Sequence, residues 1–285
     1  NTFLPSRSVF EYRKKKKEKL RILKKLVAFY NRKGGVGKTT LLINLAIKSS
    51  TYGFKTIIVD MDSQANATKT CQIENPKTRD TFFNIFKGES TIKEATIEVK
   101  GNLSIIPANV KLTKLSNEIE SFKGFRQFKP FFDELRDNYD FVFVDCGGIM
   151  DMQTFQTLAC ADYIISPAFP DDYSEEGLEL TKEEVDKLHA QGFRPILKIV
   201  PNKYREKKIA SSFFDLYYDL YKDSVTKTKI RECQELTNAT NAGLSIFEFN
   251  PQSSAAEDID ALYDELFSQD IATLRASDST EKELQ

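Results

Sequence analysis

The chain is short of the residues on which several classes of protein depend. Its 285 residues include four cysteines and a single histidine. The cysteines are far apart and form no C-x-x-C pair, which argues against a zinc site or a disulfide scaffold and suits a reducing compartment. His189 falls late in a stretch with helical character, so we expect a surface side chain there and neither a metal ligand nor a general base.

Long apolar runs are also missing. No uninterrupted stretch approaches the roughly 20 residues that a membrane-spanning helix needs, and the start of the chain has no apolar core of a signal peptide. The composition, 40% hydrophobic and 29% charged, is ordinary for a globular protein. These absences predict a cytoplasmic protein that is long enough to bury a sizeable core.

The charge is balanced in total but unevenly distributed. The formal net charge is −1, yet residues 1–26 contain ten lysines and arginines against two glutamates, and residues 251–285 contain nine acidic residues against two basic ones. We interpret residues 1–25 as a basic N-terminal extension, which is either a solvated arm or a contact for DNA or an anionic surface. Residues 269–285 are interpreted as an acidic C-terminal tail, and the chain is expected to be frayed from Ser268 onward.

The sharpest motif lies at residues 26–40. An apolar run that ends at Tyr30 is followed by a glycine-rich string and then by an apolar pattern with helical spacing. Strand, glycine loop and helix in this order predict a phosphate cradle, because backbone N–H groups and the helix N-terminus converge on phosphate oxygens. Lys38 is expected to reach the β- and γ-phosphates, and the Thr39 hydroxyl to bind Mg²⁺. The predicted nucleotide-binding residues of the loop are Lys33, Gly34, Gly35, Val36, Gly37, Lys38, Thr39 and Thr40.

The loop departs from the common phosphate-loop pattern at its start. G-x-x-x-x-G-K-[ST] places a glycine five residues before Gly37, and this chain has Arg32 there. A second lysine, Lys33, instead precedes Gly34. This string is the deviant form of the Walker A motif.

Acidic residues end two later apolar runs. Residues 55–60 predict a buried parallel strand that ends in Asp60-Met61-Asp62, and residues 139–145 predict another that ends in Asp145. Carboxylates beside a phosphate loop require a Mg²⁺ ion or a positioned water molecule. We therefore expect Asp145 to hold Mg²⁺ as a Walker B residue, and Cys146-Gly147-Gly148 to begin a segment that senses the γ-phosphate.

Predicted strands and helices alternate along the rest of the chain. Further strands are expected at 103–107, 161–167 and 196–200, short helices and loops over 76–102, helices at 111–122, 125–138, 174–190, 204–222, 229–241 and 255–267, and an extended piece at 246–248. We expect these strands to be parallel. The predicted fold class is α/β, a single doubly wound and mostly parallel sheet with helices on both faces over residues 26–268, as in P-loop NTPases.

Three of these motifs together resemble a known family. Lys33–Thr40, Asp60–Thr68 and Asp145 with its glycine pair are similar to the motifs of the ParA family of partition ATPases, within a wider group that includes MinD. The resemblance continues through residues 161–167, 176–178 and 249–256. Two departures are Ser63, where the family usually has proline, and residues 146–148, where it has Thr-Pro-Pro or a near relative.

The resemblance implies an ATPase that works as a homodimer with ATP and Mg²⁺. Lys33 of each protomer would cross to the partner's phosphates, much as an arginine finger does, and Asp62 would position the attacking water. Pro201 and Asn202 would contact adenine. The implied catalytic residues are Lys33, Lys38 and Asp62, and the implied metal site consists of Thr39, Asp60 and Asp145. The ATP dimer would bind DNA without sequence preference until a ParB-type partner stimulated hydrolysis.

Charge marks one candidate DNA surface. Residues 203–231 contain eight lysines and arginines against four acidic residues. By charge alone this stretch is either a solvated helix face or a set of contacts to DNA phosphates, and the family's use of the region favours DNA. The candidate DNA-binding residues are Lys203, Arg205, Lys207, Lys208, Lys227, Lys229 and Arg231.

Other functions of the same superfamily make different demands on the sequence. A MinD-like, membrane-positioned ATPase would carry a basic amphipathic helix at the C-terminus, where this chain is acidic. An iron–sulfur carrier would need paired cysteines, and a tyrosine autokinase would need a C-terminal tyrosine cluster; the sequence has neither. A further alternative is a nucleotide-gated regulator with little hydrolysis. It stays open because residues 146–148, in the segment expected to sense the γ-phosphate, differ from the family's pattern. We expect a nucleoid-associated partition protein that does not bind membranes.

Overall fold

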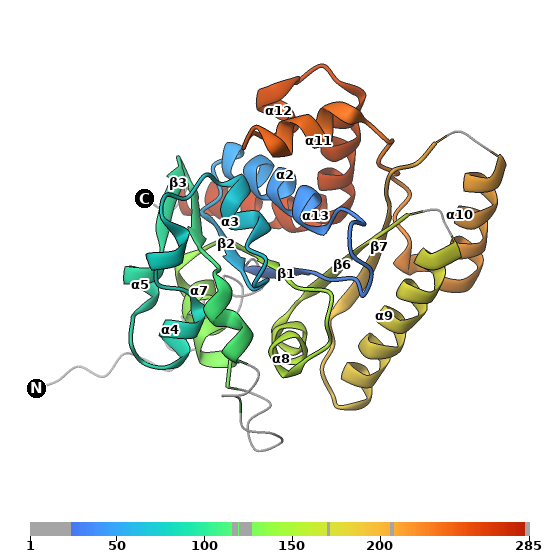
Figure 1. Ribbon diagram of the computed structural model, residues 1–285. Helices are drawn as coiled ribbons and strands as arrows, with labels where there is room; N and C mark the ends of the chain where they lie inside the picture. Colours follow the sequence, from blue (N-terminus) through green and yellow to red (C-terminus); the bar gives the residue numbers. More distant parts are fainter. Residues whose placement is uncertain (1–23, 116–118, 120–126, 170–171, 206–207, 283–285) are drawn as a thin grey trace, which may run out of the picture.

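The computed structural model describes residues 24–115, 119, 127–169, 172–205 and 208–282. Within these ranges a seven-stranded sheet has the strand order β3-β4-β2-β5-β1-β6-β7. Figure 1 shows this sheet in edge-on view, with helices on both of its faces. The prediction of a doubly wound, mostly parallel α/β sheet is confirmed.

The central strands are short apolar runs that are buried on both faces, as expected for parallel strands covered by helices. In the described part of the sheet every neighbouring pair is parallel except β3 and β4, which form an antiparallel hairpin. The strands are β1 Lys25–Phe29, β2 Thr56–Asp60, β3 Ile97–Lys100, β4 Leu103–Ile106, β5 Phe141–Asp145, β6 Tyr163–Ala168 and β7 Ile196–Pro201.

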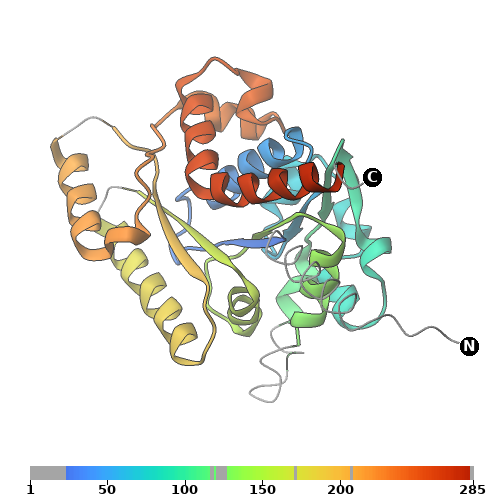
Figure 2. The same cartoon turned by 180° about the vertical axis from the view of Figure 1, so that it is seen from behind.

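Helices cover the sheet in two layers. In Figures 1 and 2, α2, α11, α12 and α13 lie on one face, whereas α4, α7, α8 and α9 lie on the other. The described helices are α2 Lys38–Thr51, α3 Asn66–Thr70, α4 Phe82–Phe86, α5 Ile92–Ala95, α7 Lys129–Asn138, α8 Met152–Cys160, α9 Asp172–Ala190, α10 Lys208–Tyr221, α11 Gln234–Asn241, α12 Ile246–Phe249 and α13 Ser254–Lys282, with 3₁₀ turns at Pro76–Thr78, Val110–Lys114 and Lys222–Ser224.

Strand β1 is anchored in both hydrophobic cores. Leu26, Ala28 and Tyr30 pack into the core beneath α7, α8 and α9, while Val27 and Phe29 pack into the core beneath α2 and α13. This alternation follows from the period of two along a strand. The glycine loop therefore leaves the sheet from a strand that is held on both sides.

Several predicted elements differ from the structure. Residues 246–248 were expected to be extended but form α12, because Ser245 and Glu248 make a reciprocal capping box at its start. Within 76–102, which were expected to hold short helices and loops, β3 adds an antiparallel edge strand after α4 and α5. The helix predicted from residue 229 begins only at Gln234, because Ile230 N donates to Pro201 O (2.8 Å) and ties that segment to β7.

Other differences concern helix ends. Of the helices predicted at 111–122 and 125–138, the described residues form the 3₁₀ turn at Val110–Lys114 and α7, and residues 116–118 and 120–126 lie outside the described ranges. Helix α8 is an addition, and α13 continues to Lys282 beyond the predicted end at 267. Residues 1–23 of the predicted basic extension are not described. The described helices offer no candidate membrane span.

Candidate nucleotide site

The carboxyl ends of β1, β2 and β5 bring the predicted site residues together. In the sheet register Phe29 lies opposite Asp145, and Asp145 lies opposite Asp60. The glycine loop joins β1 to α2 at this edge, as the connection between these two labels in Figure 1 shows. Loop and carboxylates thus meet where open α/β sheets bind ligands.

The loop is shaped by Gly37 and by Asn202, the residue that directly follows β7. Gly37 has a φ of +101°, a conformation that favours glycine. A Cβ at this position would lie 2.3 Å from Asn202 Nδ2, which donates to Val36 O at 2.6 Å. Asn202 therefore supports the loop directly, and its predicted contact with adenine stays a prediction.

Lys38 reaches back across the loop. Its Nζ donates to the carbonyl oxygens of Asn31 and Lys33, both at 3.1 Å. Burial lowers the pKa of this ammonium, although the charges of Asp145 and Asp62 act in the opposite direction. The cation is therefore held inside the curve of the loop, the place expected for phosphate oxygens.

Thr39 and Asp145 are joined by a hydrogen bond. Thr39 Oγ1 donates to Asp145 Oδ2 at 2.7 Å, whereas Asp145 Oδ1 is buried with no hydrogen-bond partner among the described residues. Burial, together with the nearby charge of Asp60, raises the pKa of the Asp145 carboxyl well above its usual range. A buried oxygen without a donor is costly, and a Mg²⁺ ion with its water molecules would satisfy it, so the residues fit this metal.

Protein groups alone would not complete a metal site here. The described residues contain no cluster of three or more His, Cys, Asp or Glu that could hold an ion. Mg²⁺ in nucleotide sites is commonly bound through one or two carboxylates with phosphate oxygens and water. A metal at Thr39 and Asp145 would therefore depend on a bound nucleotide.

Asp60 has a different environment from Asp145. Its Oδ1 accepts from Asp62 N (3.1 Å), and its Oδ2 accepts from Thr68 N (2.8 Å) and Thr68 Oγ1 (2.7 Å). Burial raises the pKa of the Asp60 carboxyl to about 6. Both oxygens thus hold the turn after β2, and the predicted role of Asp60 at the metal stays a prediction.

Asp62 lies beside the glycine pair. A Cβ on Gly147 would be 3.8 Å from Asp62 Oδ1, which accepts from Gln64 N at 2.9 Å. A Cβ on Gly148 would lie 3.0 Å from the carbonyl oxygen of Arg32. The segment that follows β5 therefore contacts both the candidate water-positioning carboxylate and the start of the loop.

Lys33 is held at its backbone and lies near Phe169. Its backbone N donates to Asn31 Oδ1 at 2.8 Å, and its Nζ lies 5.9 Å from the ring centroid of Phe169. Asn31 Nδ2 in turn donates to Ser166 Oγ and Pro167 O, which ties the loop to β6. Asn31 and Thr68 are among the residues that sequence reasoning missed; an asparagine two residues after the end of β1 was the signal for the first.

Lys203 also contacts the glycine loop. It was predicted to bind DNA, but its Nζ donates to Gly35 O at 3.0 Å and lies 5.7 Å from the Phe169 ring centroid. Its backbone has a φ of +53°, so the chain turns sharply after Asn202. The structure therefore brings Lys203 to the nucleotide loop.

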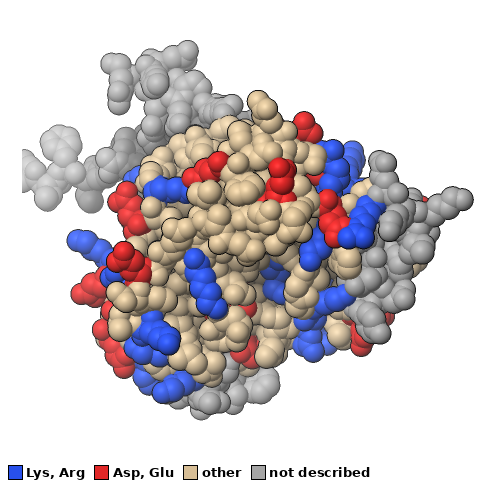
Figure 3. Space-filling model, turned by 45° about the horizontal axis from the view of Figure 1, so that its top comes forward, with Lys and Arg blue, Asp and Glu red and all other residues tan. Residues whose placement is uncertain are grey.

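The other candidate DNA residues are spread over several contacts. Arg231 makes ion pairs with Asp258 and Glu257, and Arg205 pairs with Glu232. Lys229 Nζ lies 4.7 Å from the ring centroid of Tyr204. Lys207 lies outside the described residues, as does the side chain of Lys208. On the face in Figure 3, basic and acidic side chains are interspersed and form no single basic field.

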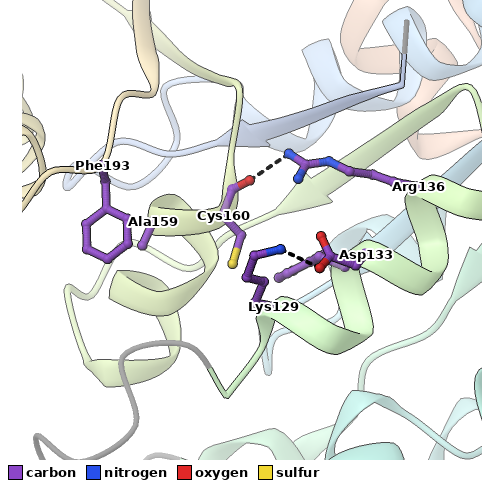
Figure 4. A pocket seen from close by; sticks show the side chains of 7 residues that line it. Lys129, Asp133, Arg136, Ala159, Cys160 and Phe193 are labelled. Carbon is purple, nitrogen blue, oxygen red and sulfur yellow. Dashed lines mark hydrogen bonds and ion pairs between the residues drawn. The ribbon is translucent and has the colours of Figure 1, made fainter. Parts of the chain in front are cut away.

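A separate cavity of about 210 Å³ lies between α7, α8 and Phe193 (Figure 4). Lys129 pairs with Asp133 in its wall, and Arg136 Nη2 donates to Cys160 O at 2.7 Å. Burial raises the pKa of the Cys160 thiol to about 11. The bond from Arg136 to Cys160 that Figure 4 draws joins α7 to α8, so we assign this cavity to helix packing.

Known proteins share both the motifs and the fold. Residues 24–199 match the family model described as an AAA domain. The chain is 27% identical to the sporulation initiation inhibitor protein Soj of Bacillus subtilis, over 82% of this chain and 94% of Soj. A plasmid partition protein of Borrelia burgdorferi is 27% identical, with a TM-score of 0.64 and coverage of 79% and 98%. MinD of Pyrococcus horikoshii, complexed with Mg-ADP, shares the fold with a TM-score of 0.70 at 20% identity and coverage of 85% and 96%.

The residues that match the AAA-domain model make up more than half of the chain. The chain therefore belongs to this AAA-domain family and to the ParA/MinD superfamily of P-loop ATPases.

Proposed function

We propose that the chain is an ATP-hydrolysing DNA-segregation protein that acts as an ATP-dependent homodimer. The observation that carries the proposal is the convergence of Lys38, Thr39, Asp62 and Asp145 at a glycine loop with a second lysine, Lys33. Membership of the ParA/MinD superfamily supports ATP as the nucleotide. The Mg-ADP complex of MinD supports Mg²⁺ as the cofactor.

Within one protomer, the proposed roles follow from position and charge. Lys38 and the N–H groups of the loop bind the phosphates, and Thr39 with Asp145 would hold Mg²⁺, which lowers charge repulsion during phosphoryl transfer. Asp62 orients the attacking water from its place beside Gly147. The hydrogen bond from Gln64 N keeps that carboxylate in one orientation.

Lys33 is proposed to act across the dimer. Its backbone N donates to Asn31 Oδ1, which fixes the start of the side chain. Its ammonium lies 5.9 Å from the centroid of the Phe169 ring. A cation at the partner's phosphates would stabilise the charge of the transition state.

The dimer is proposed to bind DNA without sequence preference and to associate with the nucleoid. A ParB-type partner would stimulate hydrolysis and release the DNA. Exposed Lys227 and half-buried Lys229 are described candidates for phosphate contacts. Lys207 and Lys208, whose side chains lie outside the described residues, remain candidates from the sequence alone. Arg231 is less suited, because Asp258 accepts from both its Nε and its Nη2.

A DNA-binding titration with ATP, with ADP and without nucleotide tests the proposal. DNA should bind in the presence of ATP but not with ADP or without nucleotide. The logarithm of the DNA-binding constant should fall against log[salt] with a slope of about −0.9 per phosphate neutralised. Equal DNA binding with ADP and ATP would contradict the proposal. Sedimentation with anionic vesicles distinguishes a MinD-like membrane role. ATP-dependent DNA binding without any phosphate release would instead favour a nucleotide-gated regulator.

A further inference from the structure

Three residues of helix α9 contact the segment that leads into the glycine loop. Gly177, Thr181 and Glu184 have the spacing i, i+4, i+7, so they lie on one face of the helix. We call them the α9 contact row. Each of them contacts the segment Tyr30–Lys33, which connects β1 to the glycines.

Glu184 makes the central contacts of the row. Its Oε2 accepts from the Tyr30 hydroxyl at 2.7 Å, and its Oε1 accepts from Arg32 Nη1 at 3.1 Å. Glu184 is 9% exposed and Tyr30 is fully buried. Burial and the neighbouring Glu184 raise the pKa of the Tyr30 hydroxyl, so this group stays the donor. A buried carboxylate with both oxygens bonded, one of them to a cation, is a strong constraint on its partners.

Thr181 contacts the backbone of Arg32, and Gly177 lies against the residues on either side of it, Asn31 and Lys33. Thr181 Oγ1 accepts from Arg32 N at 3.4 Å and donates to Gly177 O at 2.8 Å. A Cβ on Gly177 would lie 3.2 Å from Lys33 Cβ and 3.4 Å from Asn31 Oδ1. A side chain at position 177 would therefore press on Lys33 itself, and only glycine lets the helix approach so closely.

We propose that Glu184 is a positioning residue for Lys33. It holds Arg32, which stands in place of the usual first glycine, and Tyr30 at the end of β1, and so fixes the direction in which Lys33 leaves the loop. The inference rests on the proposed function, in which Lys33 acts on the partner's phosphates. A lysine that is already aimed loses less freedom when the dimer forms, so more of its charge is available in the transition state.

Glu184→Gln is the first test. The amide keeps the size of the side chain and an acceptor for Tyr30 but removes the charge that binds Arg32. Glu183→Gln is the matched control, because Glu183 is the adjacent α9 residue, is 55% exposed and pairs with Lys187 at 3.7 Å. We expect ATP affinity within about twofold of the wild type in both variants, and a roughly tenfold loss of turnover and of ATP-dependent dimerisation in Glu184→Gln alone.

Coupling distinguishes positioning from general support of the fold. Arg32→Gln should show the same loss, and adding Glu184→Gln to it should cause no further loss. In a Lys33→Ala background, Glu184→Gln should leave the dimerisation constant unchanged, because its effect passes through Lys33. A Glu184→Gln protein that matches the Glu183→Gln control, or a loss that adds to that of Lys33→Ala, would overturn the inference.

Amide hydrogen exchange provides a readout that does not depend on ATPase activity. Peptides covering residues 31–36 should exchange faster in Glu184→Gln than in Glu183→Gln, since Arg32 loses its ion pair with α9. If the wild-type protein neither dimerises with ATP nor hydrolyses it, the proposed function fails. Exchange still tests the α9 contact row in that case, and unchanged protection of residues 31–36 would contradict it.

Discussion

Thr39 donates its hydroxyl to Asp145 at 2.7 Å, and this bond joins the first turn of α2 to the end of β5. One oxygen of Asp145 is used in the bond, while the other is buried with no partner among the described residues. The bond joins the glycine loop and the Walker B aspartate, which the sequence predicted to share a metal site, into one structural unit. Asp145 Oδ1 is therefore the oxygen that a bound cation would satisfy.

Asp145→Asn should separate metal dependence from nucleotide binding. The amide still accepts from Thr39 but no longer carries a charge, so phosphate release should fall about 10–100-fold and require more Mg²⁺. The folded protein should be at least as stable as the wild type, because burial already raises the pKa of Asp145 and disfavours its charged form. Phosphate release measured against Mg²⁺ concentration checks this, with Asp137→Asn on the exposed side of α7 as control. Unaltered Mg²⁺ dependence would remove Asp145 from the metal site.

Gly148→Ala and Gly147→Ala form a matched pair in the segment after β5. A Cβ on Gly148 would press on the Arg32 carbonyl at 3.0 Å, whereas a Cβ on Gly147 meets nothing closer than 3.8 Å. Gly148→Ala should therefore displace the start of the loop and weaken ATP binding several-fold, by about 1 kcal/mol. Gly147→Ala should bind ATP as the wild type does. Equilibrium nucleotide titration compares the two, and equal affinities would show that this packing does not matter for binding.

Asp62→Ala should retain the ATP dimer but slow turnover by about 100-fold, the scale of a lost group that positions or accepts a proton. Gln64→Ala is a suitable control, because Gln64 contacts Asp62 through its backbone N and that bond survives the change. Sedimentation velocity with ATP reports the dimer, and phosphate release reports turnover. Wild-type turnover in Asp62→Ala would exclude Asp62 from orienting water.

Lys203→Ala and Lys227→Ala should affect different ligands. Lys203 donates to Gly35 O in the loop, so its loss should weaken ATP binding by roughly 1 kcal/mol and leave the salt dependence of DNA binding unaltered. Lys227 is exposed, and its loss should lower the salt slope by about one while ATP affinity is kept. A lower slope of DNA binding against salt in Lys203→Ala would instead indicate that this lysine contacts DNA.

Local patterns were sufficient to predict the parallel strands and the loop, but not the antiparallel edge strand β3. A glycine–lysine–threonine string after an apolar strand, and apolar runs that end in aspartate, are contiguous in sequence and need no tertiary information. The capping signature at Ser245 and Glu248 was also present, but a four-residue helix is too short for periodicity to detect.

Contacts between distant segments could not be predicted in the same way. The bond between Arg32 and Glu184 joins residues 152 positions apart, and nothing in either neighbourhood indicates it. Asp60 was expected to face the metal, yet Thr68 takes one of its oxygens through a turn that sequence patterns do not specify. Lys203 looked like part of a basic stretch, and only its positive φ and its contact with Gly35 reveal where it lies.

The comparison of Lys38→Ala with Lys33→Ala tests the central claim most directly. ATP binding, ATP-dependent dimerisation and phosphate release are measured for both proteins under the same conditions. Lys38→Ala should lose ATP binding, since this ammonium lies inside the loop. Lys33→Ala should bind ATP normally but lose hydrolysis and form a weaker dimer. Normal hydrolysis by Lys33→Ala would contradict the account of a two-lysine site shared between protomers.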